Sequence, residues 1–232
     1  AGWDGLGFAP TGAIMTPGAI TPGGHGSADL IYCPPVSFVY DFTINKSAMG
    51  VVAPATFGAN NGTVFVGNGS QTADVSVGSR SGMTNLLGYG VEVRGNTGTN
   101  GLHAQVGFNT PAHGGDSTGD IMVETKEGGL TMQAGAQDSH TFVGHGGIGG
   151  THNQSGMIRV DTTHGTNAGD VTISAGTGSS AFSQIGHGGI NVAGNQGSAA
   201  ANQELLVTGR NIDLNGGGVG ANDAYARIGH GG

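Results

Sequence analysis

The chain has little charge, and what it has is mostly acidic. Lys, Arg, Asp and Glu together make up 9% of its 232 residues, and only 7 residues are Lys or Arg. An average soluble domain is about 25% charged. The few basic residues are scattered, so no cluster exists that could follow a phosphate backbone. We therefore expect no nucleic-acid partner.

Cysteine and long apolar runs are also scarce. The single cysteine, Cys33, excludes an intramolecular disulfide and leaves two roles, a buried thiol or a bond between molecules. No apolar run reaches the roughly 18 residues of a membrane-spanning helix. No signal peptide is visible, and the first residue is Ala1, which fits both a processed exported protein and an excised piece. Low charge with abundant Gly, Asn, Thr and Ser favours an extracellular or cell-surface location.

Glycine, by contrast, is abundant, with 50 residues. Because glycine weakens helices and strands unless a turn needs its freedom, this content indicates many turns. Disorder is the alternative for a Gly-rich chain of low charge. However, 36% of the residues are hydrophobic and they recur in short alternating runs, which favours short strands.

Residues 1–60 differ from the remainder in composition. They hold six of the seven prolines, about half of the aromatic residues and only four charged residues. One strand is expected from Val36 to Ile44, with alternate hydrophobic residues on one face. Those residues are Val36, Phe38, Tyr40, Phe42 and Ile44. A segment this apolar is expected to cap its own domain or to dock on a neighbouring molecule.

Residues 61–232 contain a repeat of about 40 residues. A signature of Val or Ile followed by Gly-His-Gly-Gly occurs three times, with starts 42 and 43 residues apart. Its glycines and histidines are Gly144, His145, Gly146, Gly147, Gly186, His187, Gly188, Gly189, Gly229, His230, Gly231 and Gly232. Fainter copies are expected upstream, at Val106-Gly107-Phe108 and at Val66-Gly67-Asn68-Gly69.

Each full repeat holds three short strand-like pieces with hydrophobic residues on one face. The first pieces begin at Ile121, Ile158 and Leu205, and the second at Leu130, Val171 and Ile212. The third lead into the signature from Phe182 and Tyr225, with His140 to Val143 as a looser match. The sequence therefore predicts an all-β fold, a β-solenoid (β-helix) built from these repeats, because stacked units bury an apolar edge that one unit cannot. A β-sandwich is the competing fold.

The patterns Gly-x-Ile-x-Val, Gly-x-Leu-x-Leu-x-Gly and Ile-Gly-His-Gly-Gly resemble the repeats of large bacterial surface proteins similar to filamentous-haemagglutinin-type adhesins. The likeness covers roughly residues 86 to 232. It implies bacterial-type export and a role in adhesion or surface fibres. The chain is much shorter than such adhesins, and residues 1–60 match no part of the family.

The three signature histidines are the natural candidates for chemistry. In a solenoid they would form a ladder, and neutral imidazole is a common metal ligand. One histidine per coil makes a row rather than a tetrahedral cage, so a structural role for the repeat turn is favoured and no cofactor or metal is expected. Gly217 to Asp223 nearly matches a calcium-binding nonapeptide, but such sites need the pattern in tandem.

No catalytic motif is present, and the acidic residues are spread along the repeats without a recurring pair. We therefore expect a structural protein rather than an enzyme. The first hypothesis is a filament subunit that docks head to tail on its own copies, through residues 1–60 and an uncapped C-terminal coil. Removal of residues 1–45 should then leave a folded chain that does not polymerise. The alternative is an adhesin fragment or carbohydrate-binding β-helix whose partner is a surface glycan or host surface.

Overall fold

The computed structural model describes residues 32–33, 55–59, 63–67, 75–108, 115–197 and 205–231, and β1 (Tyr32–Cys33), β2 (Ala55–Ala59) and β3 (Thr63–Val66) are described mainly by their backbone. All regular elements in these ranges are β-strands. The described residues therefore contain no helix that is long and apolar enough to cross a membrane. The predicted strand at 36–44, Gly232 and most of residues 1–60 lie outside the described residues. The fold is all-β, and all strand pairings among the described residues are parallel.

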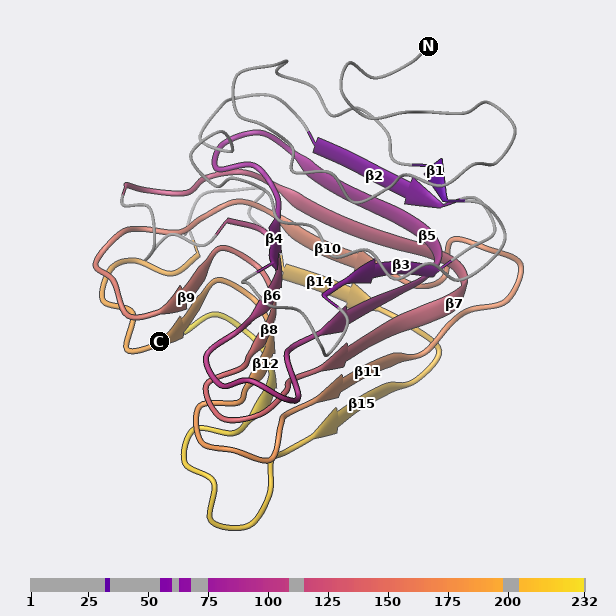
Figure 1. The fold of residues 1–232 in the computed structure, drawn as a ribbon. Coiled ribbons are helices and arrows are strands. Elements are labelled where there is room, and N and C mark those ends of the chain that lie inside the picture. Colours follow the sequence, from indigo (N-terminus) through magenta and orange to yellow (C-terminus); the bar gives the residue numbers. More distant parts are fainter. Residues whose placement is uncertain are drawn as a thin grey trace.

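The largest sheet has nine strands and is strongly curled, so that it forms two sides of the molecule (Figure 1). Two long strands, β5 (Thr84–Arg94) and β7 (Ile121–Gln133), bend at a corner and contribute to both sides. The first side also contains β1, β2, β10 (Ile158–Asp161) and β14 (Leu205–Thr208). The second side contains β3, β11 (Val171–Ser174) and β15 (Ile212–Asn215).

A five-stranded sheet forms the third side. Its order is β16 (Ala226–Ile228), β12 (Ser183–Ile185), β8 (Thr141–Val143), β6 (Ala104–Val106) and β4 (Val75–Val77). A further pair, β9 (Gly146–Ile148) and β13 (Gly188–Ile190), follows the third side. This pair lies within and just after the signature, where the sequence predicted a turn.

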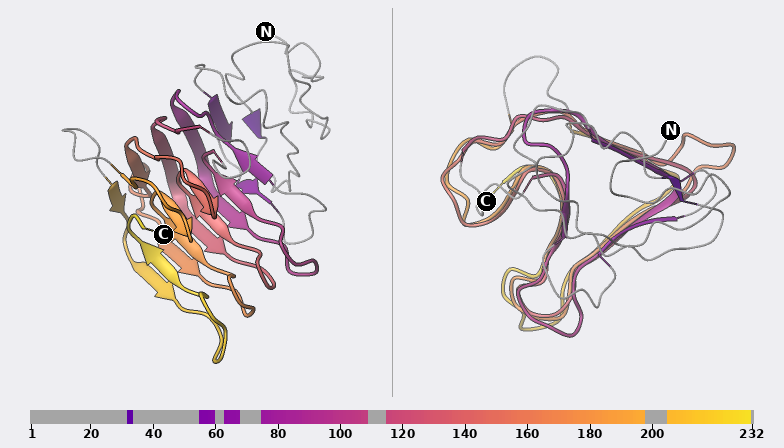
Figure 2. Two further views of the ribbon diagram at one scale, coloured as in Figure 1. Left: turned by 90° about the vertical axis from the view of Figure 1, so that its left-hand side faces the viewer. Right: turned by 45° about the horizontal axis from the view of Figure 1, so that its top comes forward.

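The chain therefore follows one route repeatedly: first side, second side, third side, then back to the first. We call one such passage a circuit. Viewed along the stack, successive circuits nearly superpose, and viewed from the side their strands lie next to one another (Figure 2). Equivalent histidines are 42 and 43 residues apart.

The predicted strand sets are confirmed by the observed register. Ile121, Ile158 and Leu205 lie opposite one another, and Leu130, Val171 and Ile212 form the second set. In the third set Thr141 pairs with Ser183, which confirms His140 to Val143 as the looser match. One difference from the prediction concerns the circuits of β5 and β7. There the first and second strand-like pieces are continuous and form one bent strand.

The upstream copy of the signature predicted at Val66 is wrong. Val66 lies opposite Val93, on the second side, whereas the residue opposite Val106 is Val77. The early circuit is shorter than the later ones, so a spacing of about 40 residues points to the wrong valine. Pairing of β2 with β5 also shows that the sheet continues upstream of residue 60.

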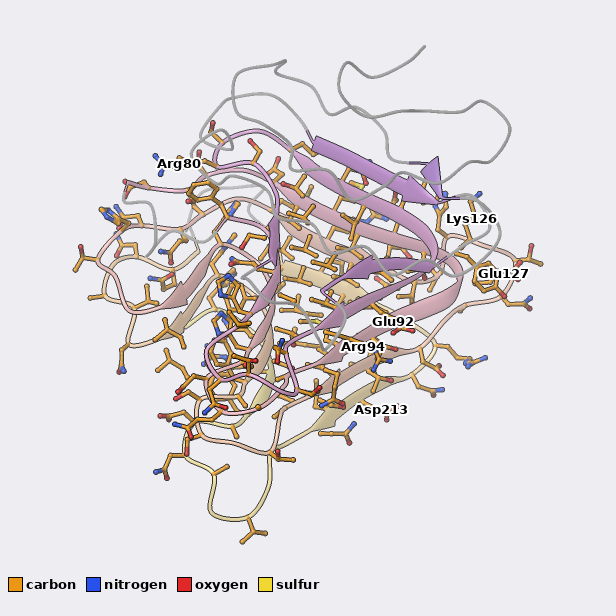
Figure 3. The ribbon with its side chains drawn as sticks, viewed as in Figure 1. Arg80, Glu92, Arg94, Lys126, Glu127 and Asp213 are labelled. Atoms are coloured by element: carbon orange, nitrogen blue, oxygen red, sulfur yellow. The ribbon has the colours of Figure 1, made fainter. Side chains whose placement is uncertain are left out.

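Inward-facing side chains form the core. Leu86, Val123 and Val160 succeed one another on the first side, and Val93, Met132 and Ile173 do so on the second, all fully buried. Charged side chains point outward, including Glu92 and Arg94 on β5, Asp213 on β15, and Lys126 and Glu127 at the corner of β7 (Figure 3). This alternation is what the period-two pattern requires.

Candidate functional site: the signature column and its open edge

The signature residues of successive circuits form one column beside the third side. Gly144 N–H donates to Val106 O, Gly186 N–H to Val143 O and Gly229 N–H to Ile185 O, each at 2.9 Å. The glycine that follows the histidine repeats this pattern. Gly188 N–H donates to His145 O and Gly231 N–H donates to His187 O, both at 3.0 Å. The column is thus a regular main-chain ladder that runs from one circuit to the next.

The histidine rings add a second ladder to the first. Phe108 N–H donates to His145 Nδ1 at 3.0 Å, His145 N–H to His187 Nδ1 at 3.1 Å and His187 N–H to His230 Nδ1 at 3.0 Å. Neighbouring rings stack with centroids 5.2 and 5.1 Å apart. The sequence placed these histidines at one repeat position, and the structure brings them together as a row.

The second ring nitrogen is also engaged. His145 Nε2 lies 2.7 Å from Gly119 O and His187 Nε2 lies 3.0 Å from Gly156 O, and a carbonyl can only accept. Both rings therefore carry the proton on Nε2 and accept at Nδ1. The lone pair that a metal ion would require is used by a backbone N–H in each case. Among the described residues, no three metal-ligating side chains gather at one place.

Burial controls the charge of these histidines. It lowers the pKa of His145 to about 4 and that of His187 to about 3, and for His187 the proximity of His145 lowers the pKa further. Burial also lowers the pKa of His230, which is covered on one side only. All three imidazoles are therefore neutral near pH 7, the state that lets Nδ1 accept.

Glycine is required where successive circuits touch in this column. Gly186 has a φ of +145°, and a Cβ added to it would lie 2.1 Å from Gly229 O. A Cβ on Gly144 would meet Gly186 O even more closely. Both added atoms would be directed at the following circuit, so Gly144 and Gly186 each make room for the circuit after their own.

Two further sets of side chains on the third side also connect successive circuits, and the sequence did not predict their contacts. Gln105 Nε2 donates to Gly144 O at 2.8 Å, and Gln184 Nε2 donates to Gly229 O at 3.2 Å, so side chains on the third side hold the signature of the next circuit. His103, His140, Phe182 and Tyr225 also stack in order, with centroid distances of 4.7, 4.7 and 5.1 Å. The sequence does carry a sign of these contacts, because a polar or aromatic residue stands at a constant distance before each signature.

Two acidic side chains, Asp116 and Asp170, connect one circuit to the next. Asp170 accepts from Arg210 at 2.7 and 2.8 Å, and Asp116 accepts from Asn153 at 2.9 Å. The Arg210 hydrogen bond lowers the pKa of Asp170, and the Asn153 backbone N–H lowers that of Asp116. Both carboxylates are thus held in the charged form as partners of the next circuit.

The last described circuit presents an open edge, which we define as β14, β15 and β16. Each of these strands pairs on one side only among the described residues. Ile212 and Leu214 on β15 are 43% and 48% exposed, whereas Val171 and Ile173, their equivalents one circuit earlier, are fully buried. The open edge therefore carries core-type residues with no described circuit over them.

The predicted docking residues Val36, Phe38, Tyr40, Phe42 and Ile44 lie outside the described residues, so their position relative to this edge remains a prediction. Comparison with family models, with curated proteins and with solved structures found no match to the chain.

Proposed function

We propose that this chain is a β-solenoid with a structural role, exported from a bacterial-type cell, whose copies assemble head to tail into a surface filament. The observation that carries the proposal is the open edge. Ile212 and Leu214 continue core columns that are fully buried in earlier circuits, yet both are exposed. Apolar residues in such a position gain stability when another circuit covers them.

The main chain of the open edge favours the same kind of contact. A strand edge with unpaired N–H and C=O groups is a template for pairing with another chain. Strand addition supplies main-chain hydrogen bonds, and pockets for alternate side chains supply specificity. Because β14, β15 and β16 each pair in parallel with the circuit before them, a further circuit that runs in the same direction fits this edge best.

Head-to-tail addition explains why the product is a filament. The contact joins two different surfaces, so it leaves an open edge on each new copy and does not close on itself. In the proposal, residues 1–60 of the incoming copy cover the open edge, with the strand Val36 to Ile44 as the apolar contact. The partner of the chain is therefore another copy of itself.

The alternative is that the chain is an adhesin repeat or a carbohydrate-binding β-helix of a larger surface protein. The resemblance of its signature to filamentous-haemagglutinin-type repeats favours this reading. In that case further repeats cover the open edge, and the outer polar face binds a surface glycan or host surface. A non-catalytic role is common to both proposals, because the carboxylates described above serve as links between circuits.

A single charge on the open edge separates these proposals. Leu214→Lys places a charge on the core-facing side of β15, and Asp213→Lys places the same charge on its outer side as a matched control. We expect sedimentation velocity to show large species that grow with concentration for the unaltered chain and for Asp213→Lys, but monomer for Leu214→Lys. Assembly of Leu214→Lys equal to that of the unaltered chain would rule out the open edge as the contact.

A further inference from the structure

Asparagine followed by glycine is the pair in which the main chain most readily attacks its own side chain, because glycine has no Cβ to hinder the approach. Two such pairs lie in the described residues, Asn100-Gly101 and Asn215-Gly216. All four residues are exposed, so exposure does not distinguish one pair from the other. The hydrogen bonds of the two glycine N–H groups do distinguish them.

The N–H group of Gly101 is held by the circuit after its own. It donates to Gln137 O at 3.1 Å, and Gly101 has the φ of a left-handed turn, +79°. A main-chain nitrogen bonded in this way reacts only when the turn opens locally. The fold therefore protects the Asn100-Gly101 pair.

Asn215 is the last residue of β15, on the open edge of the second side (Figure 1). In two earlier circuits the N–H just after the equivalent strand residue donates to the circuit that follows. Ala134 N–H donates to Ser174 O at 3.0 Å. Ala175 N–H donates to Asn215 O at 2.9 Å. Gly216 N–H is the next donor in this column, and the described residues offer it no acceptor.

The surroundings of Gly216 also leave its main chain room to move. A Cβ added to Gly216 would meet no atom within 4 Å, and its φ lies outside the left-handed region. The Asn215 amide donates through Nδ2 to Ser174 Oγ at 3.2 Å, and this hydrogen bond is exposed to water. Neither the attacking nitrogen nor the amide that it attacks is therefore fixed by a buried contact.

We propose that Asn215-Gly216 is a spontaneous deamidation site, reactive while the open edge is uncovered and protected when another copy covers it. The Gly216 main-chain nitrogen forms a bond with Asn215 Cγ and gives up its proton. Nδ2 leaves with that proton as ammonia, and a cyclic succinimide remains. Water then opens either imide carbonyl, so that aspartate or isoaspartate replaces the asparagine. Water is the only co-reactant.

Both products change the open edge. Each adds a negative charge at the end of β15, and isoaspartate also adds a carbon atom to the main chain. The groups after that atom lose their register with a docking circuit, so a deamidated copy should be extended less readily. The reactivity of the isolated chain stands on the structure alone, whereas protection by docking rests on the proposed head-to-tail assembly.

The test follows deamidation of the full chain at mildly alkaline pH by mass spectrometry of its tryptic peptides. Trypsin separates the two pairs, because Asn100 lies in the peptide 95–126 and Asn215 in the peptide 211–227. Samples are aged below and above the concentration at which the chain assembles, and also unfolded in guanidinium chloride. Gly216→Ala is the control variant, since its Cβ meets no neighbour in the fold but hinders the attack on Asn215.

In the folded, unassembled chain we expect Asn215 to deamidate about tenfold faster than Asn100, the effect of one main-chain hydrogen bond that must open first. The two asparagines should react at similar rates in the unfolded chain, and Gly216→Ala should react much more slowly at Asn215. Ageing should raise the critical concentration for assembly of the unaltered chain but not that of Gly216→Ala.

Equal rates at Asn215 and Asn100 in the folded chain would overturn the inference. If Asn215 reacts as fast in the assembled chain as in the unassembled one, docking does not cover it and the proposed protection is wrong. If the chain assembles at no concentration and Asn215 still reacts faster than Asn100, the proposed filament is wrong and the deamidation site stands.

Discussion

The histidines of the signature column fill space between circuits, and their ring nitrogens also connect the backbones of those circuits. His145 and His187 each accept from one backbone N–H and donate to a carbonyl of another segment. Both rings are buried, so a ring nitrogen that lost its partner would leave a polar group without compensation. The geometry works only for the neutral imidazole.

Acid is therefore expected to destabilise the fold through these histidines. In the unfolded chain a histidine titrates near pH 6.5, whereas in the fold the pKa of His145 is about 4 and that of His187 about 3. As the pH falls below 6.5 the unfolded chain takes up protons that the fold does not, so stability decreases, by up to about 1.4 kcal/mol per histidine for each pH unit. Urea denaturation between pH 7 and 4.5 measures this.

The double variant His145→Asn/His187→Asn is the control for that experiment. It removes both titrating groups but keeps an acceptor near each Nδ1 position. Its stability, although lower at pH 7, should change much less between pH 6.5 and 4.5, where most carboxylates are still charged. An unaltered chain as stable at pH 4.5 as at pH 7 would contradict the described burial of the two imidazoles.

Two glycines at the same repeat position should differ sharply when changed to alanine. At Gly186 a Cβ would lie 2.1 Å from Gly229 O, so backbone must move and we expect a loss of more than about 3 kcal/mol. At Gly229 only the unfavourable φ remains, and we expect about 1 kcal/mol. Thermal unfolding at a concentration too low for assembly measures both, and equal losses would contradict the stacked column.

The sequence predicted which residues share the column, because an identical Gly-His-Gly-Gly motif repeats at a nearly constant interval. It did not predict what the histidines bond to. Gly119 and Gly156, which accept from His145 and His187, lie 26 and 31 residues before them. Nothing local in the sequence marks such a carbonyl, since its role depends on how the circuits fold over one another.

Strands were predicted well where their hydrophobic residues alternate. All three strand sets pair in the expected register, because a shift by one residue would expose every core side chain. The pair β9 and β13 was missed, since Gly146-Gly147 and Gly188-Gly189 read as turn residues. Their positive φ values nevertheless allow an extended pairing that no other residue type would adopt there.

The contribution of a core residue to the free energy of unfolding should depend on its position along the stack. Ile173 and Leu214 lie opposite each other in one column, but the first is fully buried and the second is 48% exposed. We expect Ile173→Ala to lower the free energy of unfolding by about 2–5 kcal/mol and Leu214→Ala to lower it by less than about 1 kcal/mol. Denaturant unfolding of the monomer at low concentration compares them.

A concentration series extends this comparison to assembly. If copies dock on the open edge, Leu214→Ala should become costly only at concentrations where the unaltered chain associates, because Leu214 is then covered. A large cost at every concentration would mean that Leu214 is already buried in the isolated chain, contrary to its exposure in the structure.

At the scale of the whole chain, the sequence divides into a repetitive part and an N-terminal part, residues 1–60, of different composition. Its all-β class with parallel sheets followed from the repeat, whereas the early circuit was misplaced because its length departs from the later ones. The central claim concerns the stack as a whole. Its open edge retains the core residues, glycine conformation and main-chain groups of an interior circuit.

Negative-stain electron microscopy of the full chain at near-neutral pH, over a range of concentrations, tests that claim most directly. The account predicts unbranched filaments with a constant axial repeat, formed above a threshold concentration and absent for Leu214→Lys. Dispersed short particles of one size at every concentration would contradict it, and would favour a repeat module of a larger surface protein instead.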